Sequence, residues 1–98
     1  MMRPIKMTDL TYESEGISVG FDLFEVYDLC GIEIVLLADR VVCHIWATDG
    51  ELLTGECGDV GKTVEEQVNI AVVRLLAKLL DKEPVLLYKV YDELTAIK

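Results

Sequence analysis

The residues that come nearest to a chemical motif lie between a predicted strand and a predicted helix. The segment Gly58-Asp59-Val60-Gly61-Lys62-Thr63 places Gly-Lys-Thr after a glycine-rich turn, which is the setting of a nucleotide-binding P-loop. That motif needs a further glycine where this chain has Glu56. The carboxylates of Glu56 and Asp59 would also repel phosphates. We therefore interpret the segment as a capped turn that leads into a helix.

A metal site or a catalytic triad would have to include His44, the only histidine of the chain. Its neighbour Cys43 would point to the opposite face of a strand, so the two side chains cannot easily share one ion. Cys30, Cys43 and Cys57 show no CxxC or similar spacing, and no triad spacing surrounds His44. We predict three reduced, mostly buried thiols and a non-enzymatic protein without a metal or cofactor.

Acidic charge is concentrated in the first two thirds of the chain. Between Thr8 and Gly61, twelve acidic residues accompany a single base, Arg40, so this stretch carries −11 and the rest +2 of the total of −9. Charge polarised in this way steers encounters with positive surfaces and repels nucleic acid. We expect a protein partner with a basic surface and no direct binding of nucleic acid. The residues predicted to contact this partner are Asp22, Glu25, Asp28, Glu51, Glu56 and Asp59.

Length and composition predict one compact domain over residues 1–98, with residues 1–16 only partly ordered. A chain of 98 residues that is 52% hydrophobic can bury a core. No apolar run approaches the length of a membrane span, and the opening MMRPIKM lacks the apolar core of a signal peptide. We expect a cytoplasmic protein that does not bind membranes.

The strongest predicted element is a helix over Val64–Asp81. Thr63 and Glu66 form a capping box at its start, and Pro84 ends it. At about 100° per residue, the apolar positions cover roughly half of the helix circumference. One face of a sheet cannot cover so wide an arc, so a second contact is expected, with either the C-terminal segment or another protomer. The residues predicted for a contact between protomers are Val73, Leu76 and Leu80.

Three strands are predicted before this helix, over Ile32–Ala38, Val41–Ala47 and Leu52–Cys57. The first two show little alternation, so both of their faces are expected to be covered. Asp49-Gly50 is a hairpin signal between the second and the third strand.

Two segments are ambiguous. Phe21–Cys30 separates into an acidic and an apolar side when it is wound as a helix, and Gly31 then stands where a helix cap is wanted. We predict a helix there, although the Phe, Val and Tyr content favours a strand. Val85–Tyr91 fits either a further strand or a short C-terminal helix.

These elements predict an α+β fold with a three-stranded antiparallel sheet, or a four-stranded one, packed by the long helix. The predicted order is α-β-β-β-α, followed by the C-terminal strand or short helix.

From Gly31 to Leu80 the sequence resembles the double-stranded-RNA-binding domain. The resemblance rests on the hairpin at Asp49-Gly50, on the small-residue strand with Gly55 and Gly58, and on GKTVEEQVNIAVVRLL, which opens the last helix. In that family, lysines at the start of this helix grip RNA phosphates, whereas this chain offers Lys62 and then Thr-Val-Glu-Glu. The resemblance therefore implies the fold without the RNA binding.

Two functions follow from these observations. The first is a small acidic protein-binding module that occupies a basic surface of a nucleic-acid-binding partner. In size and charge it is analogous to phage-type inhibitors such as anti-CRISPR proteins and nucleic-acid mimics. Trp46 and Tyr27 are its predicted half-exposed anchors. The alternative is a homodimeric adaptor or chaperone-like protein that uses its surplus apolar surface. It would bury either Val73, Leu76 and Leu80 or the segment Val85–Tyr91 across a two-fold axis.

Overall fold

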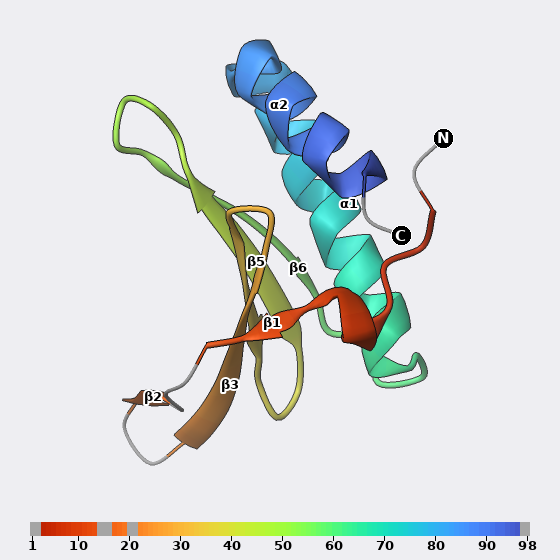
Figure 1. The fold of residues 1–98 in the computed structure, drawn as a ribbon. Coiled ribbons are helices and arrows are strands. Elements are labelled where there is room, and N and C mark those ends of the chain that lie inside the picture. Colours follow the sequence, from red (N-terminus) through yellow and green to blue (C-terminus); the bar gives the residue numbers. More distant parts are fainter. Residues whose placement is uncertain (1–2, 14–16, 20–21, 97–98) are drawn as a thin grey trace.

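An antiparallel sheet followed by two helices makes up the described part of the protein (Figure 1). The computed structural model describes residues 3–13, 17–19 and 22–96, and the side chains of residues 17–19 and 22–24 lie outside that description. The elements are a 3₁₀ turn η1 (Met7–Asp9), β1 (Thr11–Tyr12), β2 (Ile17–Val19), β3 (Asp22–Leu29), β4 (Ile32–Leu36), β5 (Val41–Trp46), β6 (Leu52–Cys57), α1 (Val64–Lys82) and α2 (Pro84–Thr95).

The strands lie in the order β1-β3-β4-β5-β6, and each neighbouring pair is antiparallel. Strand β2 pairs with the first residues of β3, off this path. Strands β3 to β6 form a meander in which consecutive strands are neighbours. Cys30 and Gly31 connect β3 to β4 with φ angles of 52° and 86°. Two successive positive φ angles are typical of a tight type I′ hairpin turn, so these residues make a turn and not a helix cap.

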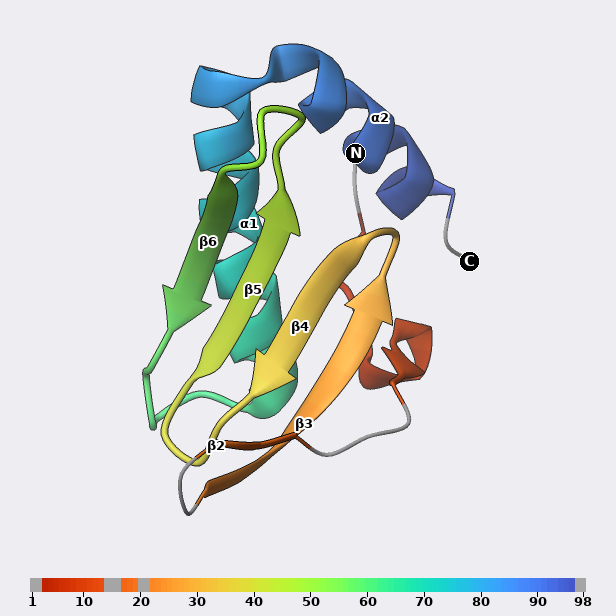
Figure 2. The same cartoon turned by 90° about the vertical axis from the view of Figure 1, so that its left-hand side faces the viewer.

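Helix α1 lies across one face of the sheet, mainly behind β5 and β6, and α2 packs against α1 (Figure 2). The core forms between this face and α1. Ile32, Ile34 and Cys43 contribute from the sheet, and Val72 and Leu75 contribute from the helix, all fully buried. The opposite face of the sheet has no helix over it among the described elements (Figure 2). We call it the open face.

The predicted capping box is present at the start of α1. The Thr63 hydroxyl accepts a hydrogen bond from the Glu66 amide, and the Glu66 carboxylate accepts one from the Thr63 amide. Pro84 has two roles, because it lies just beyond the end of α1 and is also the first residue of α2. At that position proline loses nothing, since its missing N–H would have no partner inside the helix.

The predicted order α-β-β-β-α is wrong. Among the described residues every strand precedes the first α-helix, and the sheet contains more strands than the three or four predicted. The segment predicted as a helix, Phe21–Cys30, contains strand β3 (Phe21 itself lies outside the described residues). The described chain therefore has no helix before the sheet, contrary to the order that the resemblance to the double-stranded-RNA-binding domain implied. The ambiguous segment Val85–Tyr91 is helical, as part of α2.

The physical reason for the correction at β3 is pairing on both of its edges. Strand β4 pairs along one edge of β3, and β1 and β2 pair along the other. These backbone hydrogen bonds outweigh the amphipathic pattern that favoured a helix. Carboxylates are tolerated on both sides of β3 because it lies near the edge of the sheet, where Glu25 is exposed and Asp28 is half-buried.

Candidate functional site

The open face carries side chains in three cross-strand rows. Partners in the strand register share a face of the sheet, and the buried core residues of β4, β5 and β6 occupy the alternate positions. The middle row is Asp28, Glu33, His44 and Thr54. The row on one side of it is Val26, Val35, Val42 and Glu56, and on the other side is the pair Trp46 and Leu52.

The middle row places two acidic residues opposite each other. Asp28 and Glu33 are register partners on β3 and β4, where like charges destabilise a sheet. The ring of His44 lies 2.7 Å from Glu33, between its Nε2 and a carboxylate oxygen. Asp28 has no ion pair within the described part of the chain. The row thus retains negative charge on a surface that solvent can reach.

Apolar side chains flank this acidic row on both sides. The side chain of Trp46 is 65% exposed and that of its register partner Leu52 is 40% exposed. On the other side, Val35 and Val42 are half-buried. A large exposed aromatic such as Trp46 is a residue type that is enriched in protein-binding surfaces.

The structure separates the six acidic residues predicted to contact a partner. Asp28 and Glu56 belong to the open face. Glu25 lies on the other side of β3, where it accepts a hydrogen bond from the hydroxyl of Tyr27. Asp22 lies at the start of β3, and its side chain is outside the described residues.

The acidic side chains at the turns already have partners. Glu51 and Asp49 both bind Lys82, and the ion pair with Asp49 measures 2.9 Å. Asp59 accepts a hydrogen bond from the amide of Gly61 at 3.0 Å. On the open face, Glu56 lies 3.7 Å from Arg40. On the open face, Asp28 is therefore the acidic residue without an ion pair in the described part of the chain. Its register partner Glu33, which is bonded to His44, was not singled out by sequence reasoning.

Both predicted aromatic anchors can now be placed. Trp46 is exposed on the open face. Tyr27 lies on the helix side of β3, packs against the core and makes an edge-to-face contact with Tyr12 at 5.2 Å between ring centroids. Tyr27 is therefore a packing residue.

No signal in the sequence predicted the pairing of Trp46 with Leu52. A two-residue turn at Asp49-Gly50 would set Trp46 opposite Leu53. The loop instead has three residues, and Ala47 bonds to Glu51 across it.

The net negative charge of the protein comes from the part of the chain that forms the sheet. Residues 1–61 contain twelve acidic and three basic residues, a net charge of −9. Residues 62–98, which form the two helices, contain six acidic and six basic residues and carry no net charge. The electrostatic character of the molecule therefore belongs to the sheet and its loops.

A second surface lies on the helices. A groove of about 410 Å³ runs between α1 and α2, and its lining is almost entirely apolar. We call it the helical groove. It includes all three residues predicted for contact between protomers, of which Val73 and Leu80 are exposed and Leu76 is half-buried. Its lining residues are Val73, Leu76, Ala77, Leu80, Leu87, Tyr88 and Tyr91.

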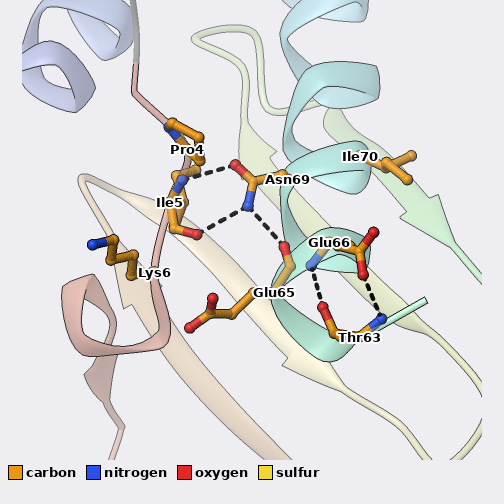
Figure 3. Close-up of a pocket in the computed structure, with 8 residues that line it drawn as sticks. All are labelled: Pro4, Ile5, Lys6, Thr63, Glu65, Glu66, Asn69 and Ile70. Atoms are coloured by element: carbon orange, nitrogen blue, oxygen red, sulfur yellow. Dashed lines mark hydrogen bonds between the residues drawn. The ribbon is translucent and has the colours of Figure 1, made fainter.

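The loop that resembles a P-loop leads into a helix whose start is capped and acidic. The capping box occupies the amides of Thr63 and Glu66, and the carboxylates of Glu65 and Glu66 lie in the first turn. Figure 3 shows the neighbouring pocket, where the side chain of Asn69 is hydrogen-bonded to the backbone of Ile5. These groups stabilise the protein itself and leave a phosphate few free donors.

The sheet separates Cys43 from His44. Cys43 is buried in the core while His44 lies on the open face, so the two side chains point in opposite directions. Burial raises the pKa of the Cys43 thiol to about 12. No cluster of three or more His, Cys, Asp or Glu side chains suited to a metal occurs among the described residues. His44 is hydrogen-bonded to Glu33 and to no hydroxyl or thiol in that part of the chain.

The sequence and the structure were compared with known proteins. No family model, no curated protein and no solved structure matches this chain. None of the helices in the described part is long and apolar enough to cross a membrane.

Proposed function

We propose that this protein is a non-enzymatic protein-binding module whose open face binds a basic surface of a partner protein. The observation that carries the proposal is the arrangement of that face. An acidic row runs between apolar rows, next to the exposed Trp46, and no helix of the described chain covers it. Its Asp28 has no ion pair among the described residues.

A cationic partner suits this arrangement for two reasons. Asp28 and Glu33 repel each other across β3 and β4, and an arginine or lysine placed between them would relieve that repulsion. The exposed ring of Trp46 can accept a guanidinium over its face, and the aliphatic stems of such side chains can cover Leu52.

Proteins that bind nucleic acid are the natural class of partner, because they present large basic surfaces. A small acidic protein bound to such a surface would exclude the nucleic acid. This is the action of an inhibitor of the nucleic-acid-mimic type, and the proposal rests here on charge and size and on no family relationship. The −9 carried by residues 1–61 would also accelerate the encounter.

The test is capture of partners from a lysate at low and high salt, followed by direct titration of each purified partner. Trp46 is the single tryptophan, so its fluorescence reports on the open face alone. We expect an emission shift on binding, an affinity that falls with salt, and competition by DNA or RNA.

Charge reversal supplies the matched control. Glu33→Lys should weaken binding at least tenfold, and Trp46→Ala should do the same, as expected for hot-spot residues. Glu93→Lys changes the net charge equally but lies on α2. If both charge reversals weaken binding to the same extent, or if binding leaves the Trp46 emission unchanged, the open face is not the binding surface.

A further inference from the structure

The two helices carry more exposed apolar surface than any other part of the described chain. Ten large hydrophobic side chains are exposed in the described chain, and six of them lie on α1 and α2. Val64, at the start of α1, lies away from the other five. Val73 and Leu80 on α1 are each 56% exposed, and on α2 Val85 is 82% and Tyr88 is 63% exposed. Tyr91 of α2 lines the helical groove with Tyr88.

The exposed apolar side chains of the helices are not part of the hydrophobic core. The buried stripe of α1 is formed by Val68, Ala71, Val72, Leu75 and Leu79, which face the sheet. The groove residues Val73, Leu76 and Leu80 lie on a different side of the helix. Helix α2 covers only part of that side, and it buries Val90 and Leu94. An apolar surface of this kind on a small protein marks an interaction site.

We infer that the helical groove binds a second copy of this chain and forms a homodimer. The inference is independent of the proposed function, because it uses the other side of the molecule. The first argument is charge. The helical half has no net charge, while the sheet half carries −9. Two copies that meet through their helices keep their acidic halves apart, whereas contact through the open faces would bring them together.

The second argument is shape. The surface offers a groove between the helices, and the exposed side chain of Tyr88 protrudes from its wall. A two-fold axis makes every contact occur twice, so Tyr88 of each copy can enter the groove of the other. Tyrosine suits this role because its ring is apolar and its hydroxyl can remain in water.

The third argument is size. At 1.5 Å per residue, the 19 residues of α1 are about 28 Å long and the 12 residues of α2 about 18 Å, and each helix is about 10 Å wide. They offer about 460 Å² of flat face per copy, or roughly twice that in a dimer, which is the size of a weak, concentration-dependent interface. The dimer would present two open faces on opposite sides and could hold two partners, or two sites of one partner, at once.

The experiment is measurement of the solution mass by light scattering and analytical ultracentrifugation between about 1 and 200 μM. We expect twice the monomer mass of 11.0 kDa at the upper concentrations. High salt should leave the dimer intact or strengthen it, since it screens the acidic halves. The emission of Trp46 should not change on dimerisation, which separates this surface from the open face.

Two charged variants on the groove are compared with a third elsewhere. Leu80→Glu and Tyr88→Glu alter exposed positions, so the fold should survive, and each should weaken the dimer at least tenfold. Val60→Glu makes the same kind of change at a position that is 88% exposed and outside the groove. A wild-type monomer at 200 μM, an intact dimer in both groove variants, or equal dissociation in Val60→Glu would overturn the inference.

Discussion

A β-carbon added to Gly55 would lie 2.3 Å from the carbonyl oxygen of Ala71 and 2.5 Å from the amide nitrogen of Leu75. The backbone of α1 thus rests directly on β6 at this glycine. Both of these atoms belong to the helix backbone, which cannot move aside as a flexible side chain can.

Gly55→Ala should therefore destabilise the protein by about 3 kcal/mol, because α1 must shift away from its core contacts. Gly58→Ala is the matched control, since its added carbon would meet its nearest neighbours at an ordinary 3.5 Å. Urea unfolding followed by circular dichroism measures both. Equal stability of the two variants would show that α1 does not approach β6 as closely as described.

Removal of the Asn69 side chain should detach the N-terminal segment. Its amide oxygen accepts a hydrogen bond from the Ile5 amide at 2.8 Å, and its nitrogen donates to the Ile5 carbonyl at 2.9 Å. Asn69→Ala leaves both backbone groups without these partners, at a cost of about 2 kcal/mol. Hydrogen exchange should show loss of protection at Ile5. Gln67→Ala, which removes only a bond to the Lys62 carbonyl, should leave that protection intact.

The capping box should make stability depend on pH. The pKa of Glu66 is lowered from its usual 4.5, first because its carboxylate accepts a hydrogen bond from the Thr63 amide and then through the Thr63 hydroxyl. Since the folded pKa is below the unfolded one, ionised Glu66 adds stability above pH 4.5, and this is lost as the pH falls through the folded pKa. The difference in Tm between wild type and Glu66→Gln should be present at pH 7 and shrink towards pH 3.

The control for this titration is Glu93→Gln, near the other end of the helical half. It removes one carboxylate far from any helix N-terminus and should not reproduce the same pH-dependent difference. Thr63→Ala, which removes the other half of the cap, should cost about 1 kcal/mol at pH 7. A Tm difference for Glu66→Gln that does not vary with pH would contradict the ionised cap.

Two substitutions of Gly31, in the turn between β3 and β4, should differ in how far they destabilise the protein. Its φ of 86° is unfavourable for a side chain, and nothing lies within 4 Å of an added β-carbon, so the cost of a substitution is conformational. Gly31→Ala should cost about 1 kcal/mol, and Gly31→Asn should cost less because asparagine tolerates positive φ. Equal costs in urea unfolding would indicate that the turn has another geometry.

Much of the second half of the fold was predictable from local patterns. Strand β6 has the predicted bounds, β4 and β5 end within two residues of prediction, and α1 extends only one residue further. These elements have strong signals: β-branched runs, an Asp-Gly turn, and a capped helix with a continuous apolar arc. The start of α1 could be predicted because Thr63 and Glu66, which form the capping box, are only three residues apart in the sequence.

The first half was not predictable in the same way. Strand β3 has a helical charge pattern, and only its pairing with β4 on one edge and β1 and β2 on the other makes it a strand. The acidic partner site predicted from the sequence depended on the wrong assignment of this segment as a helix. As a helix, the segment would align Asp22, Glu25 and Asp28 in one row, whereas as a strand it sends Glu25 and Asp28 to opposite faces. The pairing of Asp28 with Glu33 needs the register of the sheet, which no single segment contains.

The meander has a consequence for the order in which the protein folds. Strands β3 to β6 pair with their neighbours in sequence, so each pairing closes a short loop at small entropic cost. The contact between Ile5 and Asn69, in contrast, joins residues 64 positions apart. Local contacts form early and distant ones form late, so the sheet and α1 should assemble before the N-terminal segment docks. The N-terminal segment should therefore be the last part to dock during folding and the first part to detach during unfolding.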